Sequence, residues 1–135
     1  MRNLPAFVNR HTGKCYAALR IIVGLLFACH GAQKLFGVLG GTILIHNPKG
    51  LIAGLIELAA GVLVALGFYA RAAAFLASGE MAVAYFMVCA SQSFWPIANG
   101  GEMAVLYCFV FLYIFFRGSG WWSVDSLRHG SHESV

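Results

Sequence analysis

Long apolar stretches with almost no charge are the feature that most constrains this chain. Residues 50–116 contain only four charged side chains, which are Glu57, Arg71, Glu80 and Glu102. Three apolar runs follow one another here, at about residues 51–69, 72–90 and 97–116. A helix needs about 20 predominantly apolar residues, at about 1.5 Å each, to cross the hydrocarbon core of a bilayer. Each run is therefore long enough to span a membrane.

A fourth run, at about residues 16–36, is also long enough, although Arg20 and three polar residues near its end interrupt it. The chain is 60% hydrophobic and 10% charged, whereas soluble domains average about 45–50% and about 25%. So few charged side chains cannot cover a soluble protein of this size, and the chain is too apolar to be disordered. The runs also lack the alternation of polar and apolar residues that a membrane barrel requires.

We therefore predict an all-α integral membrane protein in which four antiparallel transmembrane helices form one bundle. This bundle is a single domain over residues 1–135, with a polar tail at residues 119–135 that is short and mobile. Residues 37–46 are apolar but too few to span, so we expect a loop at the outer interface. Trp121 and Trp122 have the amphipathic rings typical of a membrane interface.

Basic residues predict how the helices are oriented. Seven of them fall on the side that holds both chain ends: Arg2, Arg10, Lys14, Arg20, Arg71, Arg117 and Arg128. Only Lys34 and Lys49 fall on the other side. Because cytoplasmic loops carry an excess of Lys and Arg, we expect both termini in the cytoplasm, with contact to the lipid bilayer and its anionic headgroups. The basic residues are scattered and accompanied by no stacking platform, which argues against nucleic-acid binding.

The first run has a second interpretation, as a targeting signal. Basic residues, the apolar stretch 21–28 and then Cys29 loosely resemble a secretory or lipoprotein signal. However, the apolar tract continues to Phe36, and the later runs are themselves suited to a membrane. We therefore expect this segment to be retained as the first helix.

The four cysteines give little evidence of chemistry. Cys15, Cys29, Cys89 and Cys108 show no C-x-x-C motif and no metal-ligand spacing, so no metal site is predicted. Packing as small apolar residues is favoured over a Cys29–Cys89 disulfide, which would require a short first helix. His30 is the only histidine well inside a predicted helix, and this excludes haem bound by two histidines.

Ionisable residues inside the predicted helices are the candidate functional residues, because each costs about 2.5–3.5 kcal/mol in a membrane and needs a partner or a role. His30, Gln33 and Lys34 share one face of the first helix through their spacing of three and four. One carboxylate lies on each of the other three helices: Glu57, Glu80 and Glu102. Since neighbouring helices alternate in direction, all of these side chains fall in the middle-to-outer half. This distribution predicts one polar pocket that opens outward.

Small residues next to the carboxylates predict that these faces point into the bundle. Gly50, Gly54 and Gly61 accompany Glu57 and permit close helix approach. Ala73, Ala77 and Ala84 share a stripe with Glu80, whereas the large residues Phe75, Leu76 and Phe86 fall on the lipid-facing side. A short echo, GEMAVAY at 79–85 and GEMAVLY at 101–107, repeats the Glu and places Tyr85 and Tyr107 at matching positions.

Two interpretations of the polar residues stay open. Lys34 with Glu57 or Glu102, and His30 with Glu80, could form buried pairs that only fix helix register. Alternatively, the residues form a site. Three carboxylates face one lysine and one titratable histidine, so at least one Glu is expected to be protonated or hydrated. In the outer loop, Phe94 and Trp95 either lie at the headgroups, which is favoured, or close over the pocket.

Seven short motifs extend over most of the chain. They are RIxxGLLF at 20–27, HGxQKLFG at 30–37, GLIE at 54–57, GEMAVAY at 79–85, FWP at 94–96, NGGE at 99–102 and RGxGxWSxD at 117–125. Together they resemble the DoxX family of small bacterial membrane proteins. The resemblance implies a multi-pass protein of a bacterial-type inner membrane, related to the small subunit of thiosulfate:quinone oxidoreductase. It also places His30, Lys34, Glu57, Glu80 and Glu102 at the polar motif positions of the family.

Three hypotheses of function follow. The first is a redox component that handles a quinone, an oxidoreductase subunit in which His30, Glu57 and Glu80 are catalytic and Gln33, Lys34 and Glu102 bind the quinone. No redox centre is encoded, so a quinone or partner subunits of a redox complex must carry the electrons. The second, close behind, is a non-catalytic accessory subunit of a membrane complex. The third is a small proton-coupled transporter, which the lack of a Glu in the first helix disfavours. No covalently bound cofactor is expected, and a homo-oligomer stays open.

Overall fold

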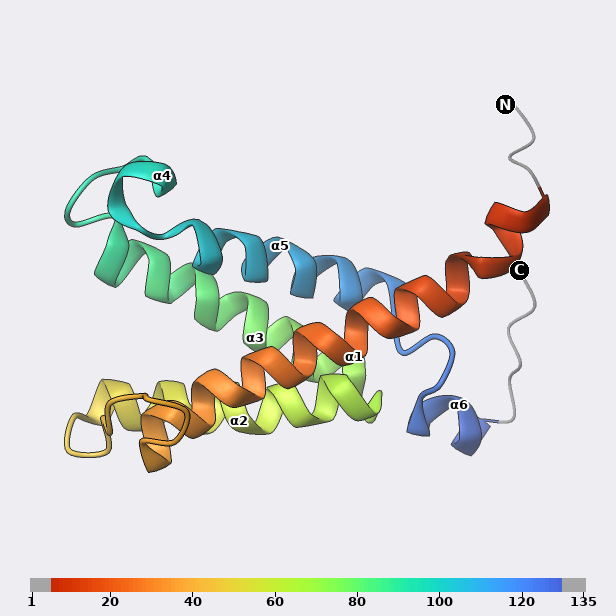
Figure 1. Cartoon of the computed structure of the whole chain (residues 1–135), viewed down its shortest axis with the longest axis horizontal. Coiled ribbons are helices and arrows are strands. Elements are labelled where there is room, and N and C mark those ends of the chain that lie inside the picture. The colour runs from red at the N-terminus through yellow and green to blue at the C-terminus, as the bar shows by residue number, and fades with distance from the viewer. Residues whose placement is uncertain (1–5, 130–135) are drawn as a thin grey trace.

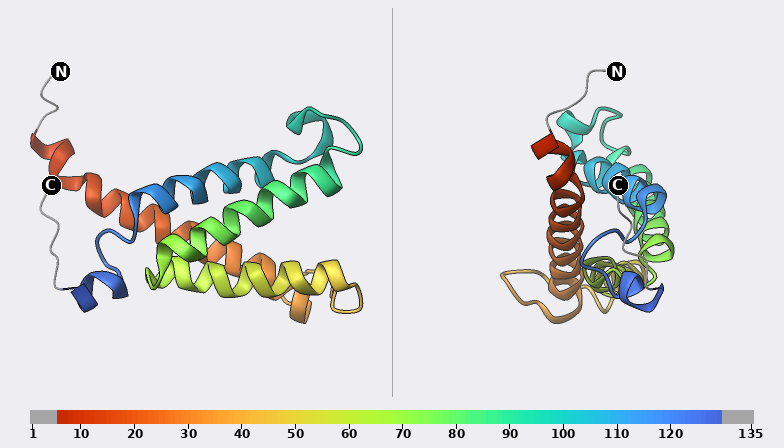
Figure 2. Two further views of the ribbon diagram at one scale, coloured as in Figure 1. Left: turned by 180° about the vertical axis from the view of Figure 1, so that it is seen from behind. Right: turned by 90° about the vertical axis from the view of Figure 1, so that its right-hand side faces the viewer.

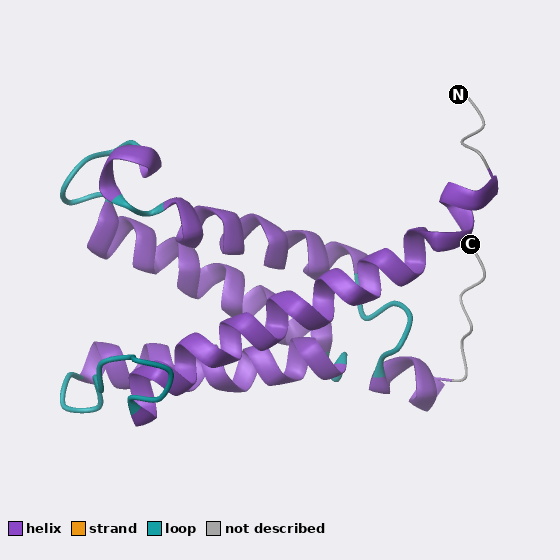
Figure 3. Cartoon of the chain, viewed as in Figure 1, coloured by secondary structure: helices purple, strands orange, loops and turns teal. Residues whose placement is uncertain are grey.

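The computed structural model describes residues 6–129, and within that range every regular element is helical (Figure 3). The elements are α1 (Ala6–Phe36), α2 (Pro48–Leu66), α3 (Ala70–Ala84), the π-helical turn η1 (Tyr85–Cys89), α4 (Pro96–Asn99), α5 (Glu102–Arg117) and α6 (Val124–His129). The predicted all-helical class is therefore confirmed for the described residues. Arg2 and the last residues of the predicted tail, 130–135, lie outside that range.

Within residues 6–129, three helices are long and apolar enough to cross a membrane: Arg10–Phe36, Pro48–Leu66 and Ala70–Cys89. They match the predicted runs at 16–36, 51–69 and 72–90, and they define a membrane protein. Helix α5 has 16 residues and is roughly 24 Å long at about 1.5 Å per residue, less than the roughly 30 Å of a hydrocarbon core. By contrast, α1 has 31 residues and begins well before the predicted boundary at Tyr16.

Local sequence explains where the helices begin and end. Asn47 caps α2 by accepting a hydrogen bond from the Lys49 backbone N–H at 3.0 Å, and Pro48 occupies the first turn, where its missing N–H has no cost. Gly67 ends α2 at a φ of 66°, a conformation that glycine adopts without strain. The predicted helix at 97–116 is wrong at its start, because Gly100, at a φ of 70°, separates α4 from α5.

The helices pack in a chain of pairs. Helix α1 packs mainly on α2, α2 on α3, and α3 on α5. Figure 1 shows α3 and α5 side by side, with α1 crossing obliquely from one end of α2 toward the C-terminal segment. The end-on view in Figure 2 separates α1 from the α3–α5 pair, with α2 along one edge. The predicted lipid-facing residues Phe75, Leu76 and Phe86 are 61%, 51% and 65% exposed, whereas Ala73 and Ala77 are buried, as predicted.

Glycines set the contact between α1 and α2. A Cβ atom on Gly31 would clash with the Leu58 backbone nitrogen, and one on Gly61 would lie 2.5 Å from the Ala28 backbone nitrogen. Likewise, a Cβ atom on Gly24 would lie 2.6 Å from the Ala65 backbone nitrogen. The two backbones therefore touch directly, which is how small residues allow helices to associate in membranes. This confirms the predicted close approach along the Gly54–Gly61 face and extends it to α1.

The segment after α5 folds back over the helix ends, so the prediction of a mobile tail is wrong for residues 119–129. The Asp125 carboxylate accepts hydrogen bonds from the backbone N–H groups of Tyr69 and Ala70 at 3.1 and 3.4 Å, and from the Ser119 hydroxyl at 2.5 Å. The Tyr16 hydroxyl donates to the Gly118 carbonyl. These bonds join the tail to α1 and to the start of α3.

Arg20 is fully buried and ties the same segment to α2. Its guanidinium donates to the carbonyls of Val64 and Ala65 at 2.5 and 2.8 Å, and to those of Trp122 and Trp121 at 2.7 and 3.3 Å. The last carbonyls of a helix have no partner within the helix, so a cation there satisfies groups that would otherwise be buried unpaired. Arg20, which falls among the basic residues near the start of the predicted first helix, therefore lies well inside α1.

The glycine contact leads to the first prediction. Gly31→Ala should lower the free energy of unfolding by about 1–3 kcal/mol, because the new methyl group meets backbone and forces α1 and α2 apart. Thermal unfolding of the purified protein in detergent would measure the loss. Gly79→Ala is the matched control, since a Cβ atom there meets nothing within 4 Å. Equal stability of the two variants would contradict a tight α1–α2 contact.

Candidate functional site

An ion pair between α1 and α2 forms the centre of the candidate site. Lys34, in the last turn of α1, donates to Glu57 Oε1 at 2.5 Å. Glu57 lies at mid-length in α2 and is 2% exposed, whereas the Lys34 side chain is 30% exposed. The antiparallel packing at the glycine contact brings these two residues to the same level. The predicted proximity of Lys34 and Glu57 is confirmed.

Glu80 of α3 lies beside this pair. Its carboxylate is within Coulombic range of the Glu57 carboxylate and the Lys34 ammonium. Both Glu80 oxygens and Glu57 Oε2 are buried and have no hydrogen-bond partner among the described residues. Buried polar groups in proteins are nearly always paired. The arrangement therefore offers three acceptor atoms, next to one lysine, to a proton or to a ligand that donates hydrogen bonds.

Tyr107 of α5 completes the cluster and was not among the predicted site residues. Its ring is buried and lies within Coulombic range of Glu57. It packs against Phe27 at a centroid distance of 5.4 Å and stacks on Phe111 at 5.8 Å, so an aromatic wall adjoins the carboxylates. The repeated motif could have indicated this residue, because its two matching tyrosines, Tyr85 and Tyr107, are both buried at 7% exposure.

Three of the predicted site residues do not share the enclosed cluster. His30 is exposed, although its ring meets the Tyr107 ring edge-on at 6.1 Å. Gln33 donates to the Leu39 carbonyl at 3.2 Å and so supports the loop after α1. Glu102 is exposed, because the break at Gly100 makes it the first residue of α5 and so places it at the helix end. The prediction that His30 and Glu102 are enclosed with Glu57 and Glu80 is wrong; the roles of all six residues stay predictions.

Other predicted features vary in their outcome. The segment between α1 and α2 contains no helix, as predicted. Phe94 and Trp95 are each 68% exposed, so they do not close over the carboxylates. All four cysteines are free, so Cys29 and Cys89 form no disulfide; Cys15 and Cys29 are exposed, whereas Cys89 and Cys108 are partly buried. Within residues 6–129, no three His, Cys, Asp and Glu side chains are grouped to hold a metal ion.

The fold and this cluster define a helical membrane protein in which a partly exposed lysine pairs with a buried carboxylate. A family model described as DoxX matches residues 16–90. A protein of Haemophilus influenzae described as uncharacterized is 42% identical over 117 residues, which cover 82% of this chain and 87% of that protein. No solved structure matches. The chain belongs to the DoxX family.

The ion pair leads to the second prediction. Lys34→Met should cost about 2 kcal/mol of stability, because it leaves Glu57 buried without its cation. The cost is at the low end for such pairs since the Lys34 side chain is 30% exposed. The double variant Lys34→Met/Glu57→Met should recover much of the loss, because it removes the buried charge as well. Lys49→Met, at an exposed lysine, is the control, and thermal unfolding gives the comparison. No recovery in the double variant would contradict the pairing.

Proposed function

We propose that this protein is a quinone-handling component of a bacterial-type inner membrane, inserted as a four-helix bundle with both chain ends in the cytoplasm. The observation that carries the proposal is Glu80, whose two buried carboxylate oxygens have no partner among the described residues and lie beside the Lys34–Glu57 pair. A buried carboxyl group in a membrane helix, next to a paired cation, is typical of sites that bind protons or hydrogen-bonding ligands.

Helix α5 is proposed as the fourth span. It packs along α3, and its outer face carries exposed apolar residues such as Leu106, Phe109 and Phe116, at 58%, 64% and 69%. Such a face suits lipid, and a helix shorter than the hydrocarbon core is accommodated by local thinning of the bilayer or by flanking residues.

The proposed orientation rests on the basic residues. Arg71 and Arg117 lie at the end of the bundle that holds the C-terminal segment, whereas Lys34 and Lys49 lie at the other end. We predict that, of a cytoplasmic and a periplasmic reporter fused in turn to the C-terminus, only the cytoplasmic one gives a signal. A signal from the periplasmic reporter alone would contradict this orientation.

The residues of the cluster suit a quinone by the chemistry of their side chains. A bound quinone carries two electrons and two protons between redox partners. Glu80 can accept or release a proton at its carboxylate, since no described residue competes for its oxygens. Glu57 holds the Lys34 ammonium, and Lys34 extends from the buried carboxylates toward the exposed surface. Phe27 and Tyr107 supply an aromatic wall that favours a flat apolar ring over water.

The test compares bound quinone in matched variants. Protein purified under native conditions should carry quinone detectable by mass spectrometry, and Glu80→Gln should lower its affinity about tenfold or more. The loss corresponds to a hydrogen bond that involves a charged group. Glu102→Gln is the control, because that exposed carboxylate lies outside the cluster. Absence of quinone in the unmodified protein, or equal binding in the two variants, would contradict the proposal and favour an accessory subunit.

A further inference from the structure

A pocket at the opposite end of the bundle from the Lys34–Glu57 pair has no part in the proposed quinone site. It has a volume of about 910 Å³ and lies between α1, the end of α2 and the C-terminal segment. One wall is apolar and is formed by Ile21 and Leu25 of α1 and by Leu66 of α2. Leu25 and Leu66 are 52% and 53% exposed, so this wall continues onto the surface that faces lipid.

The other wall is cationic. Arg71 and Arg117 both line the pocket. The Arg117 guanidinium lies 5.4 Å from the centre of the Tyr16 ring, and its N–H groups donate to no acceptor among the described residues. Arg71 uses one nitrogen to donate to the Phe115 and Phe116 carbonyls at 3.0 and 3.2 Å. Asp125 is the acid that lines the pocket, and its carboxylate is occupied by the start of α3 and by Ser119. The local charge therefore favours an anion.

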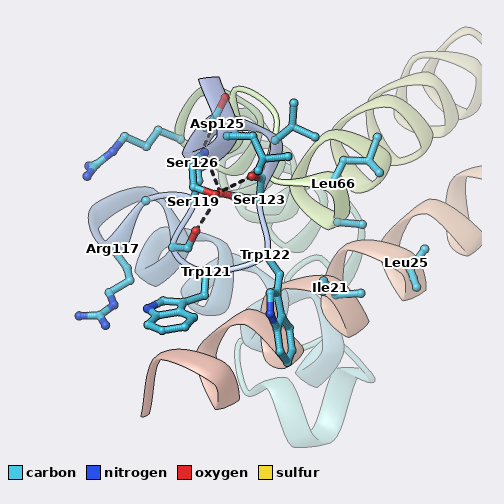
Figure 4. A pocket seen from close by; sticks show the side chains of 16 residues that line it. Ile21, Leu25, Leu66, Arg117, Ser119, Trp121, Trp122, Ser123, Asp125 and Ser126 are labelled. Carbon is cyan, nitrogen blue, oxygen red and sulfur yellow. Dashed lines mark hydrogen bonds between the residues drawn. The ribbon is translucent and has the colours of Figure 1, made fainter. Parts of the chain in front are cut away.

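Two indole rings connect the walls. In the view of Figure 4, Arg117 lies on one side and Ile21 and Leu25 on the other, with Trp121 and Trp122 between them. Their backbone is fixed because both Trp carbonyls accept hydrogen bonds from the buried Arg20. Trp122 adopts a φ of 52°, a conformation that is strained for a non-glycine residue and that the surrounding bonds must hold. The backbone of Trp121 and Trp122 is thus held in place before any ligand binds.

We infer that this pocket binds an anionic phospholipid, with the phosphate at Arg117 and Arg71 and an acyl chain along Ile21, Leu25 and Leu66. A guanidinium is well suited to phosphate oxygens, and basic pockets between transmembrane helices recognise anionic headgroups. Tryptophan rings belong at the same depth of a bilayer. A soluble phosphate compound would use the arginines but leave the apolar wall exposed. The inference depends on the placement of the chain in a membrane and not on the quinone role.

The first test uses the unmodified full chain. The protein in detergent is titrated with phosphatidylglycerol and with phosphatidylcholine of identical acyl chains, and native mass spectrometry measures the occupancy of each. Phosphatidylglycerol should bind about tenfold more tightly, because two arginines each favour an anionic headgroup. Equal binding of the two lipids would overturn the inference. Glycerol 3-phosphate, which has the same phosphate chemistry and no acyl chain, should not displace the lipid; displacement would overturn a lipid site in favour of a soluble anion.

The second test uses matched variants. Arg117→Gln should weaken phosphatidylglycerol binding about fivefold and weaken the binding of zwitterionic phosphatidylcholine less, so that the preference between the two lipids falls. Lys14→Gln is the control, since Lys14 is an exposed basic residue of α1 that does not line the pocket. Equal losses in the two variants would show only a general surface charge effect and overturn the inference. Glu80→Gln should keep the lipid preference, so that failure of the quinone proposal and failure of this one are distinguishable.

Discussion

The direct contact between the backbones of α1 and α2 is the constraint on which the polar features of this protein depend. With Gly31 against Leu58 and Gly24 against Ala65, the two antiparallel helices are fixed in register as well as in distance. Lys34 then lies opposite Glu57, and Arg20 lies opposite the last carbonyls of α2. Larger side chains at the glycines would separate both pairs, because side chains of fixed length could not reach across a wider gap.

Two cations of α1, the buried Arg20 and the partly exposed Lys34, have different environments, and this distinguishes a structural role from a candidate functional one. Arg20 donates to four backbone carbonyls, so its main effect is to hold the tail against α2. Lys34 faces an ionisable partner, and a second carboxylate, Glu80, lies nearby with oxygens that no described residue satisfies. A cation on fixed carbonyls is a structural clamp, whereas a cation paired with one carboxylate, with a second carboxyl group unpaired nearby, is typical of sites that exchange protons.

Much of the architecture could be predicted from local sequence. The lengths of the apolar runs predicted the spans, and the small residues around Glu57 and Glu80 predicted which faces are buried, because in lipid only small residues allow backbones to meet. The cluster was predicted only in part. The choice of Glu57 over Glu102 as the partner of Lys34 depends on which helices pack together, and spacing within one helix contains no information on that. Gln33 was wrongly expected in the cluster for a related reason. It shares a helix face with Lys34, but its side chain bonds to the loop after α1 and not to the carboxylates.

The sequence by itself determined that this protein is surrounded by lipid, the approximate limits of its spans and the residues that are costly in a membrane. These follow from local quantities, namely apolar length and the free energy of burying a charge. Only the tertiary structure decided that Tyr107 joins the carboxylates, that Glu102 does not, and that the tail folds over Arg20. Each of these depends on contacts between segments far apart in the chain, such as Arg20 with Trp122, and their energies arise only once the helices have packed.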